Sequence, residues 1–453
     1  MERFLFRRVE AWVVLLIVLL ALALMALVAV ITRNEAQGFN RFGIFGKAVY
    51  AVASAPSDLS DAMNRPPGNG MAAYLAKDRF AGQAGWAFAD DSAAALPDGY
   101  LLFSRFDGTE KRHRVSLFDL RTRTDVAEWP IDADRLLEGA KRDSNLIEYD
   151  RWSTARFRAI HPLATPEGDL IVKDHQSPLM RIDACGSLVW RLENDLYHHS
   201  TEPDGDGNLW LTTHMEPQSR QYLPKDFYDD AIVRVSPDGR VLYEAALTGT
   251  FRRNGMVPTI LAKDQFDSDP MHVNDVQPVP GDGPFWNKGD VFISMRNASM
   301  IALYRPSADR IIWSRQGPWA HQHDVDVLDE NRIAVFNNNS LNYGKGNKVQ
   351  EVNDVVVYDF RDGSFSSPWA AAFREADIRT LSEGLQEFLA DGNLLVEEEN
   401  AGRLMILSPD GKAAATFINR AADGVIYSLG WSRYLGRAEG DAVAKGFAAQ
   451  DCG

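Results

Sequence analysis

The chain has 453 residues, with 48 Lys+Arg against 63 Asp+Glu and a formal net charge of −15. This charge argues against a protein that holds nucleic acid through a general positive field. With 45% hydrophobic and 25% charged residues, the composition is that of a folded globular protein. The two cysteines, Cys185 and Cys452, cannot build a disulfide framework, but they leave room for one disulfide bond.

Residues 11–32, AWVVLLIVLLALALMALVAVIT, form an apolar run of 22 residues without a charge. At a rise of about 1.5 Å per residue, a helix of this length crosses a hydrocarbon core of about 30 Å. A cleaved signal peptide is the competing interpretation, but its apolar region would span only about 7–15 residues and end at a small-x-small cleavage site. The sequence therefore favours one transmembrane helix that anchors the protein in a cell membrane.

Positive charges are distributed unevenly around this apolar run. Arg3, Arg7 and Arg8 precede it, and only Arg33 follows it closely. Because positively charged flanks stay on the cytoplasmic side, residues 1–10 are expected to be a cytoplasmic tail. The remainder is then extracytoplasmic, or periplasmic in a Gram-negative cell, where a disulfide persists.

Residues 33–95 have mixed helical periodicity, followed by a Pro-Pro-Gly-Asn-Gly break at residues 66–70. We expect a stalk with a short helix and a loop in this segment. One folded domain should follow over residues 96–453.

That domain is predicted to be all-β, because short β-branched or aromatic runs alternate with Asp-Gly and Pro-Asp-Gly turns. A recurring hairpin pattern begins at Ser116, Met180, Val233, Ala302, Val356 and Met405, at intervals of 64, 53, 69, 54 and 49 residues. Blades of four strands recur at roughly 40–50 residues or more in propellers. The pattern predicts a six-bladed β-propeller with insertions.

Histidines occupy similar places ahead of several strands. His199 and His323 each lie 10 residues before the next strand's first apolar residue, and His161 lies 9 residues before. His272 takes the same place ahead of a longer insert. A structural role at blade starts is one interpretation of each histidine. In a propeller, however, these positions converge on one axis, where a ligand would bind.

Three chemical interpretations of the cluster remain open from the residues alone. A metal site would use the histidines with Asp275, Asp324 and Asp326. A sugar-binding propeller would use exposed aromatic residues, for which the candidates are Trp210, Trp286, Trp313 and Trp319. Covalent transfer of a compact anion through a neutral imidazole would also need an arginine. Arg296, at the end of a predicted strand, favours this third interpretation.

Several segments resemble the arylsulfotransferase family, the bacterial aryl-sulfate sulfotransferases that need no nucleotide sulfate donor. They are HHSTEPDGDGNLWL, MHVNDVQPV, VFISMRNASMIALY and the block from IIWSRQGPWAHQHD to IAVFNN. The resemblance covers about residues 155–435 and implies a six-bladed propeller. It also implies that His323, in the Gln-His-Asp element, is the histidine that becomes sulfated, with His272, His199 and Arg296 as further catalytic residues. The substrate-binding residues it implies are His198, His161, Asn337 and Asn274.

By this resemblance, His323 attacks the sulfur of an aryl sulfate, and a phenolic, glycan or lipid hydroxyl then accepts the sulfuryl group. His199 is expected to deliver a proton to the leaving phenol. No phosphate-binding glycine loop occurs, which counts against a nucleotide-dependent transferase. We expect no cofactor and no metal in the site that the resemblance implies. Glu397, Glu398 and Glu399 are expected to form a solvated strand end.

A function of another class is also compatible with the sequence: a catalytically silent propeller that binds a ligand or assembles an envelope complex with protein partners.

Overall fold

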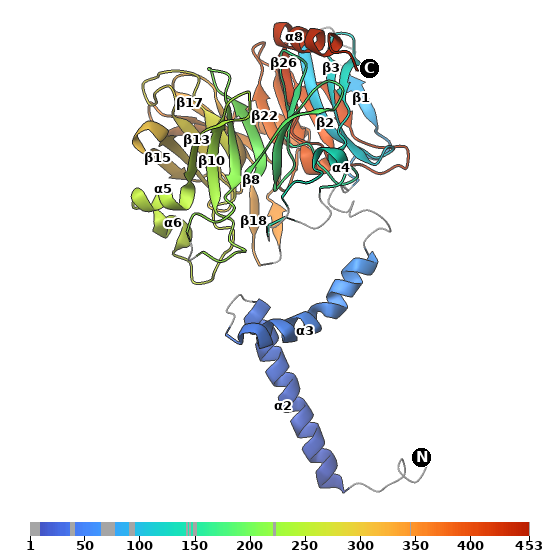
Figure 1. The fold of residues 1–453 in the computed structure, drawn as a ribbon, viewed down its shortest axis with the longest axis vertical. Coiled ribbons are helices and arrows are strands. Elements are labelled where there is room, and N and C mark those ends of the chain that lie inside the picture. The colour runs from blue at the N-terminus through green and yellow to red at the C-terminus, as the bar shows by residue number, and fades with distance from the viewer. Residues whose placement is uncertain are drawn as a thin grey trace. The chain divides into compact units, whose positions relative to one another are not determined.

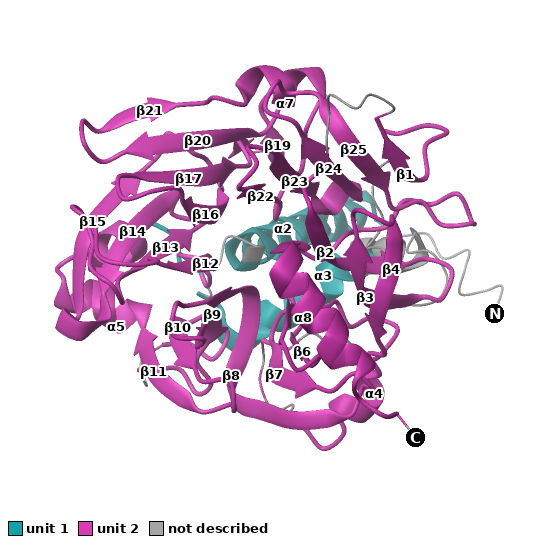
Figure 2. Ribbon diagram, turned by 90° about the horizontal axis from the view of Figure 1, so that it is seen from above, with its two compact units in different colours: residues 1–70, 262–267 teal, residues 71–261, 268–453 magenta. Residues whose placement is uncertain are grey.

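The structure is a computed structural model. It describes residues 10–36, 41–64, 78–89, 96–141, 144, 146–147, 152–220, 223–344 and 346–452. Most of the predicted cytoplasmic tail and the predicted break at residues 66–70 lie outside the described residues. The chain forms two compact units, Met1–Gly70 with Ala262–Asp267, and Met71–Leu261 with Ser268–Gly453 (Figure 2).

The first unit contains two long helices, α2 over Ala11–Ala36 and α3 over Gly43–Asn64 (Figure 1). Helix α2 has a mean hydropathy of 3.4 in its most apolar window and is long enough to cross a membrane. An apolar helix near the N-terminus is compatible with an anchor or with a signal sequence. Helix α3 is longer than the short helix expected in the stalk.

The second unit is a mainly β, propeller-like fold whose sheets stand around a common centre (Figure 2). One sheet has the strand order β26-β2-β3-β4, with bounds Arg433–Gly436, Gly99–Asp107, Arg112–Asp119 and Thr124–Trp129. Its β2 lies near the start of the unit and its β26 near the end, and Tyr100 pairs with Leu435. This pairing brings the two ends of the unit into one sheet.

A seven-stranded sheet follows, in the order β11-β10-β9-β8-β7-β6-β5. Its strands are β5 Leu163–Ala164, β6 Leu170–Val172, β7 Ser177–Ile182, β8 Leu188–Pro203, β9 Leu209–His214, β10 Asp230–Val235 and β11 Val241–Ala246. Strand β8 is 16 residues long and pairs with β7 through its first part and with β9 through its last.

The other large sheets have four or five strands. Strands β12 Val273–Pro278, β13 Val291–Met295, β14 Met300–Arg305 and β15 Arg310–Gln316 form one, and β16 His323–Val327, β17 Arg332–Asn337, β20 Asp354–Asp359 and β21 Ser364–Ser366 form the next. Strands β18 Ser340–Asn342 and β19 Asn347–Val349 make a separate hairpin.

The last sheet has the order β1-β25-β24-β23-β22. Its strands are β1 Gly85–Phe88, β22 Leu385–Phe388, β23 Leu394–Glu398, β24 Arg403–Leu407 and β25 Ala413–Ile418. Strand β1 comes from the segment 33–95 that was predicted to be a stalk, so the end of that segment contributes to a sheet.

The hairpins predicted from the sequence repeat are all antiparallel strand pairs. They are β3–β4, β7–β8, β10–β11, β14–β15, β20–β21 and β24–β25. Two of them share the seven-stranded sheet, which is continuous through β8. The number of six separate blades therefore stays a prediction.

Short helices connect and cover the sheets. They are α4 Ala133–Leu136, α5 Leu247–Arg253, α6 Val257–Leu261, α7 Ala370–Glu375 and α8 Arg437–Ala448, with 3₁₀ turns at Pro306–Ala308 and Glu399–Ala401. A disulfide joins Cys185, between β7 and β8, to Cys452, which follows α8. The one disulfide that the sequence allows is therefore formed.

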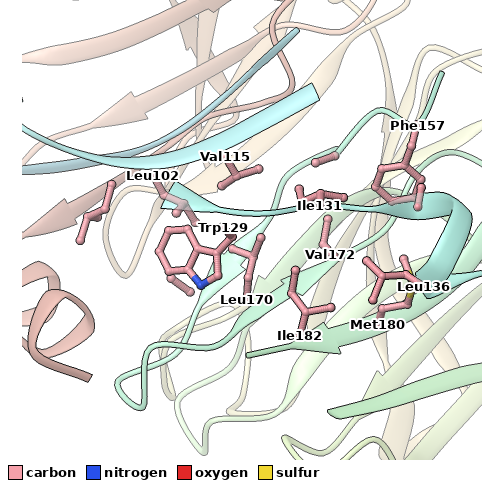
Figure 3. Packing of buried hydrophobic residues seen from close by; sticks show 14 of the residues in the cluster. Leu102, Val115, Trp129, Ile131, Leu136, Phe157, Leu170, Val172, Met180 and Ile182 are labelled. Carbon is pink, nitrogen blue, oxygen red and sulfur yellow. The ribbon is translucent and has the colours of Figure 1, made fainter. Parts of the chain in front are cut away.

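The core lies between neighbouring sheets. In the cluster of Figure 3, Leu102, Val115 and Trp129 from β2–β4 pack against Leu170 and other apolar residues of β6 and β7. Trp129 is 1% exposed, and its indole Nε1–H donates to the carbonyl of Gly168 at 2.9 Å. Both faces of a sheet are thus buried, which explains the nearly continuous apolar strands and fixes the positions of the strand ends at the centre.

Candidate active site

Residues with left-handed backbone dihedral angles lie just before the strands nearest the centre or, in β8, within the strand. They are His161 (φ 44°), His199 (φ 45°), His272 (φ 51°), His321 (φ 51°), Glu383 (φ 57°) and Trp431 (φ 60°). Such angles are uncommon for residues other than glycine, and strained backbone gathers at functional sites. His323, the first residue of β16, follows His321 by two positions.

A polar cavity of about 280 Å³ lies at this end of the strands. It is lined by Leu146, His175, Gln176, His199, Tyr228, His272, Arg296, His323, Ser382 and Glu383. The structure therefore brings together all four residues predicted to be catalytic. The ring centroid of His199 lies 5.1 Å from that of His272 and 6.3 Å from that of His323.

The hydrogen-bond network fixes the tautomer of His323. The amide nitrogen of Asn338 donates to the backbone carbonyl of Glu383 at 2.7 Å, so its Oδ1 is the atom that faces His323 Nδ1, also at 2.7 Å. Nδ1 must therefore carry the proton. The lone pair of Nε2 accepts a 3.1 Å hydrogen bond from the backbone N–H of Glu383, another residue that lines the cavity.

His323 is uncharged at neutral pH. Burial lowers its pKa to about 3, and the positive charge of Arg296 adds to this effect, while the hydrogen bond to Asn338 opposes it. A neutral imidazole with Nδ1 protonated has a lone pair at Nε2, and this lone pair can act as a nucleophile once the hydrogen bond from Glu383 opens.

Arg296 brings a positive charge to the cavity, where the charges of Asp269 and Glu383 also act on it. It follows β13, and its backbone N–H donates to the carbonyl of His272 at 3.0 Å. Its Nη1 donates to Asn297 Oδ1 at 2.8 Å, its Nε has no hydrogen-bond partner, and it makes no ion pair with any residue that the structure describes. Burial lowers its pKa. Such a guanidinium is available to an anion.

His199 and His272 differ in their partners. The pKa of His199 is held well below its usual range by burial and then by neighbouring imidazoles, so this ring is neutral. Its Nδ1 lies 2.8 Å from Nδ1 of His198. His272 instead places Nδ1 2.5 Å from Asp269 Oδ2. Burial opposes the charge on Asp269, but the hydrogen bond and charge of His272 lower its pKa overall.

The residues predicted to bind substrate lie outside the cavity wall. His198 stands behind His199, and Nδ1 of His161 accepts a 3.3 Å hydrogen bond from the backbone N–H of Thr201. Asn337 Oδ1 accepts backbone N–H groups, and Asn274 donates to the carbonyl of Gln322 at 2.7 Å. Their contacts hold neighbouring strands together, and a substrate contact by any of them stays a prediction.

Sequence reasoning missed the group around Glu383. Its Oε1 accepts from Arg158, and lies 3.2 Å from His175 Nε2, while Arg158 also reaches Oε1 of Glu399 at 2.6 Å. Burial opposes the charge of Glu383, but Arg158 and His175 hold its pKa well below the usual range. The signal in the sequence was the position of Glu383, two residues before a strand, as for His161.

The prediction for Glu397, Glu398 and Glu399 was wrong, because their exposed fractions are 0%, 1% and 0%. Glu397 accepts hydrogen bonds from the backbone N–H groups of Trp431 and Ser432 at 2.7 and 2.9 Å. A run of like charges read as solvated is in fact buried because each carboxylate has its own partners.

Similar carboxyl groups bridge other strands near the centre, and we call Asp275, Asp324, Glu387 and Glu397 the carboxyl layer. Asp275 accepts from the backbone N–H of Val325 at 2.8 Å, Asp324 from Gln386 at 2.7 Å, and Glu387 from Tyr434 at 3.0 Å. Asp275 and Asp324, considered as metal ligands from the sequence, therefore serve contacts between strands. Among the described residues, the group with the spacing of a metal site is His198, His214 and Asp230.

The arylsulfotransferase (ASST) family model matches residues 161–420. No protein among the curated proteins matches the chain. The match covers the strands that carry His161, His199, His272, Arg296 and His323, and it spans more than half of the chain.

Solved structures similar to this chain include a protein of unknown function from Bacteroides caccae, at 12% identity and a TM-score of 0.46, covering 74% of this chain and 98% of that chain. Hydrazine synthase of Kuenenia stuttgartiensis has 11% identity, a TM-score of 0.38 and coverages of 72% and 79%. Virginiamycin B lyase of Staphylococcus aureus has 11% identity, a TM-score of 0.33 and coverages of 61% and 84%.

The family match decides the assignment: the chain belongs to the arylsulfotransferase family, and it is a sulfotransferase-like enzyme with aryl sulfates as the substrates that the family implies.

Proposed function

We propose that this arylsulfotransferase-family protein is a membrane-anchored, extracytoplasmic enzyme that moves a sulfuryl group from an aryl sulfate to a hydroxyl acceptor through a sulfated His323. The observation that carries the proposal is the neutral His323 imidazole, with its acceptor nitrogen in a cavity shared with an unpaired guanidinium. The transfer uses no nucleotide donor.

In the first step, Nε2 of His323 forms a bond to sulfur as the bond between sulfur and the phenolic oxygen breaks. The hydrogen bond from the Glu383 backbone N–H to Nε2 must open first, at a cost of about 1 kcal/mol. The freed N–H then donates to a sulfuryl oxygen. The product is a sulfo-imidazolium whose Nδ1–H stays bonded to Asn338 Oδ1.

Positioning and charge stabilisation supply most of the rate in such a loose transfer. Arg296 neutralises the charge of the sulfate ester, which is a single negative charge. His199, as a neutral ring, offers a hydrogen bond to an oxygen of the transferred group. The sequence expectation that His199 protonates the phenol is replaced, because burial keeps this imidazole unprotonated and no imidazolium proton is present to be transferred.

We assign proton transfer to His272. Its Nδ1 lies 2.5 Å from Oδ2 of Asp269, which orients the ring beside the cavity. His272 gives a proton to the phenolate, whose conjugate acid has a pKa of about 10, as the phenol leaves. In the second step the same ring takes the proton of the acceptor hydroxyl, whose oxygen attacks sulfur and releases His323.

We also propose that the propeller has six blades. The support is that a residue with left-handed backbone angles occurs at or just before each of the strands β5, β8, β12, β16, β22 and β26. Two of these residues belong to the seven-stranded sheet, which would then comprise two blades that share β8.

The further proposals are an anchor at residues 11–32, a tail at 1–10, a stalk from residue 33 and a propeller to residue 453. They rest on the length and hydropathy of α2 and on the arginines before it.

The test is to mix purified protein with p-nitrophenyl sulfate in the absence of an acceptor. We expect a burst of p-nitrophenol of about one equivalent and the mass of one sulfo group on the peptide that contains His323. Added phenol should then give turnover and remove the sulfo group. Wild-type protein that gives neither burst nor turnover, while it captures envelope proteins, would establish the silent binding module instead.

A further inference from the structure

Three buried side chains behind His199 form a cluster with no function in the sulfuryl transfer. His198 on β8, His214 at the end of β9 and Asp230 at the start of β10 are 1%, 4% and 0% exposed. Their potential ligand atoms all lie within 4.8 Å of one another. The register of the sheet explains this, because Asp230 pairs directly with His214, and His198 pairs with Thr212 on the same strand as His214.

Polar atoms in this cluster lack the hydrogen bonds that buried groups normally make. His198 Nε2 and both carboxylate oxygens of Asp230 are buried without a hydrogen-bond partner. The Nε2 atoms of His198 and His214 lie 3.8 and 3.3 Å from Asp230 Oδ1, without hydrogen-bond geometry. Leaving such groups unsatisfied costs on the order of 1–3 kcal/mol each. A positive ion among them would satisfy the carboxylate and the imidazoles together.

We propose that His198, His214 and Asp230 bind a divalent transition-metal cation of the zinc class. Two imidazole nitrogens and one carboxylate oxygen are ligands that zinc prefers, and ligands about 2.0–2.2 Å from a tetrahedral ion lie about 3.3–3.6 Å apart. The separation of 3.3 Å between His214 and Asp230 falls in that range, and the separation of 3.8 Å between His198 and Asp230 lies slightly above it. This site differs from the metal site considered from the sequence, whose carboxylate ligands would be Asp275, Asp324 and Asp326.

Neighbouring contacts surround the ligands. The rings of His198 and His214 stack at a centroid distance of 3.9 Å, so they would tilt apart to point at one ion, and Tyr228 meets His214 edge to face at 4.8 Å. The hydroxyl of Thr212 donates to the backbone carbonyl of His198 at 2.6 Å and lies 3.2 Å from its Nδ1. Side chains that surround a ligand in this way commonly fix its orientation.

One consequence reaches the cavity, and this part rests on the proposed function. A metal at Nε2 of His198 requires the proton of that ring to sit on Nδ1. That proton is then donated to Nδ1 of His199 at 2.8 Å, which leaves His199 with its own proton on Nε2. The ion would thus set His199 as a hydrogen-bond donor toward the transferred sulfuryl group.

Metal content tests the site independently of sulfuryl transfer. Protein purified without a polyhistidine tag is incubated with excess Zn²⁺, desalted and measured by mass spectrometry of the elements. We expect about one zinc per chain in wild type and a loss of tenfold or more in both Asp230→Asn and His214→Gln. His113→Gln removes a buried imidazole from β3 and should keep the zinc. Wild type without zinc, or variants with as much zinc as wild type, would overturn the proposal.

A second measurement covers variants that fail to fold. Crystals of wild-type protein soaked in Zn²⁺ should show an anomalous scattering peak at the zinc edge between His198, His214 and Asp230. A peak elsewhere, or density for an ordered water without anomalous signal, would contradict the site. Both measurements give the same answer whether or not the protein transfers sulfate.

Discussion

His323 and Asp324 are consecutive residues of one strand, yet they belong to two different regions of the centre. His323 faces the cavity with imidazoles from other strands. Asp324 accepts a hydrogen bond from the backbone N–H of Gln386 on the next sheet. The other members of the carboxyl layer likewise accept from backbone N–H groups of other strands or of the segments before them. The first region lines a cavity with imidazoles and a guanidinium, and the second uses its carboxyl groups for hydrogen bonds between strands.

Burial acts on the two regions in opposite ways. It lowers the pKa of His323 to about 3 and raises the pKa values of Asp275, Glu387 and Glu397 to about 7. In both cases the low dielectric favours the neutral form. The neutral form of the imidazole can act as a nucleophile. For the carboxyl groups, the free energy of unfolding depends on pH because their ionisation in the folded protein is unfavourable. Mutations should therefore separate catalysis from stability between these regions.

The largest effect is expected from His323→Asn. Removal of the nucleophile should lower kcat for aryl sulfate turnover by about 10⁴-fold or more, because no covalent intermediate can form. Thermal unfolding should change little, since asparagine can keep a hydrogen bond to Asn338. His113→Gln, which removes a buried imidazole away from the cavity, is the control and should keep most activity per folded molecule. Sustained turnover in His323→Asn would refute the cavity assignment.

Arg296→Gln should lower kcat/KM by about 10²–10³-fold, because the positive charge that stabilises the transferring group is lost. Steady-state kinetics with p-nitrophenyl sulfate measures this loss. Arg252→Gln changes an exposed arginine of α5 and should leave the kinetics as they are. Equal losses in both variants would show that general charge, rather than the cavity guanidinium, matters.

Glu397→Gln should act on stability instead of chemistry. One of the two backbone N–H groups would face an amide NH₂ and lose its acceptor, which costs about 1–3 kcal/mol of unfolding free energy at pH 5. Activity per folded molecule should stay within about threefold of wild type. Urea unfolding measures the change, and Glu330→Gln, an exposed position, is the control.

The same variant has a defined pH dependence. The folded pKa of Glu397, about 7, lies above its ordinary 4.5, so its contribution to stability is fully present below pH 4.5 and is lost as the pH rises through 7. Glutamine cannot ionise, so the stability gap between wild type and variant should narrow by about 1 kcal/mol per pH unit between pH 5 and 7. A gap that widens with pH would contradict a buried, neutral Glu397.

Asn338→Ala should reduce turnover by about tenfold, since His323 loses the acceptor that holds its proton on Nδ1. Asn338→Asp should instead raise the pKa of His323, because a carboxylate favours the imidazolium, and bring an acid limb into the measurable pH range. Asn342→Ala in the exposed hairpin is the matched control. If all three variants have the wild-type pH profile, Asn338 does not position the nucleophile.

The smallest expected effect concerns the pH dependence of sulfation, whose rate should not change on the acid side. Sulfation of His323 in a single turnover should not slow as the pH falls from 7 to 5, because an imidazole with a pKa of about 3 stays neutral there. An ordinary histidine of pKa about 6.5 would lose about thirtyfold in rate at pH 5. Rapid-mixing measurements of p-nitrophenol release give the profile, and a decline near pH 6.5 would show that the ring is solvated.

Much of the architecture could be predicted because it depends on residues that are close together in the sequence. The apolar run that forms α2, and the turn residues that end each hairpin, act within a few residues of the chain. Spacing to the next strand also found His199, His272 and His323. It treated them as equivalent, however, whereas the backbone angles align His321 rather than His323 with the left-handed residues.

Residues whose roles depend on distant partners could not be assigned. Asn338 and Glu383 look like ordinary turn residues until β16 and the start of β22 come together around His323. The glutamates at 397–399 looked solvated because their partners, such as Trp431 and Arg158, lie far away in sequence. The strand β1 was likewise missed, since its partner β25 comes more than 300 residues later.

By itself, the sequence determined the apolar N-terminal helix, the β hairpins and the set of histidines with one arginine, because periodicity, turn chemistry and residue type are local properties. Only the tertiary structure decided which of the polar groups face a cavity and which form hydrogen bonds with neighbouring strands. The reason is that a buried polar group is defined by its partners and its exclusion from water, and both arise when strands distant in the chain meet.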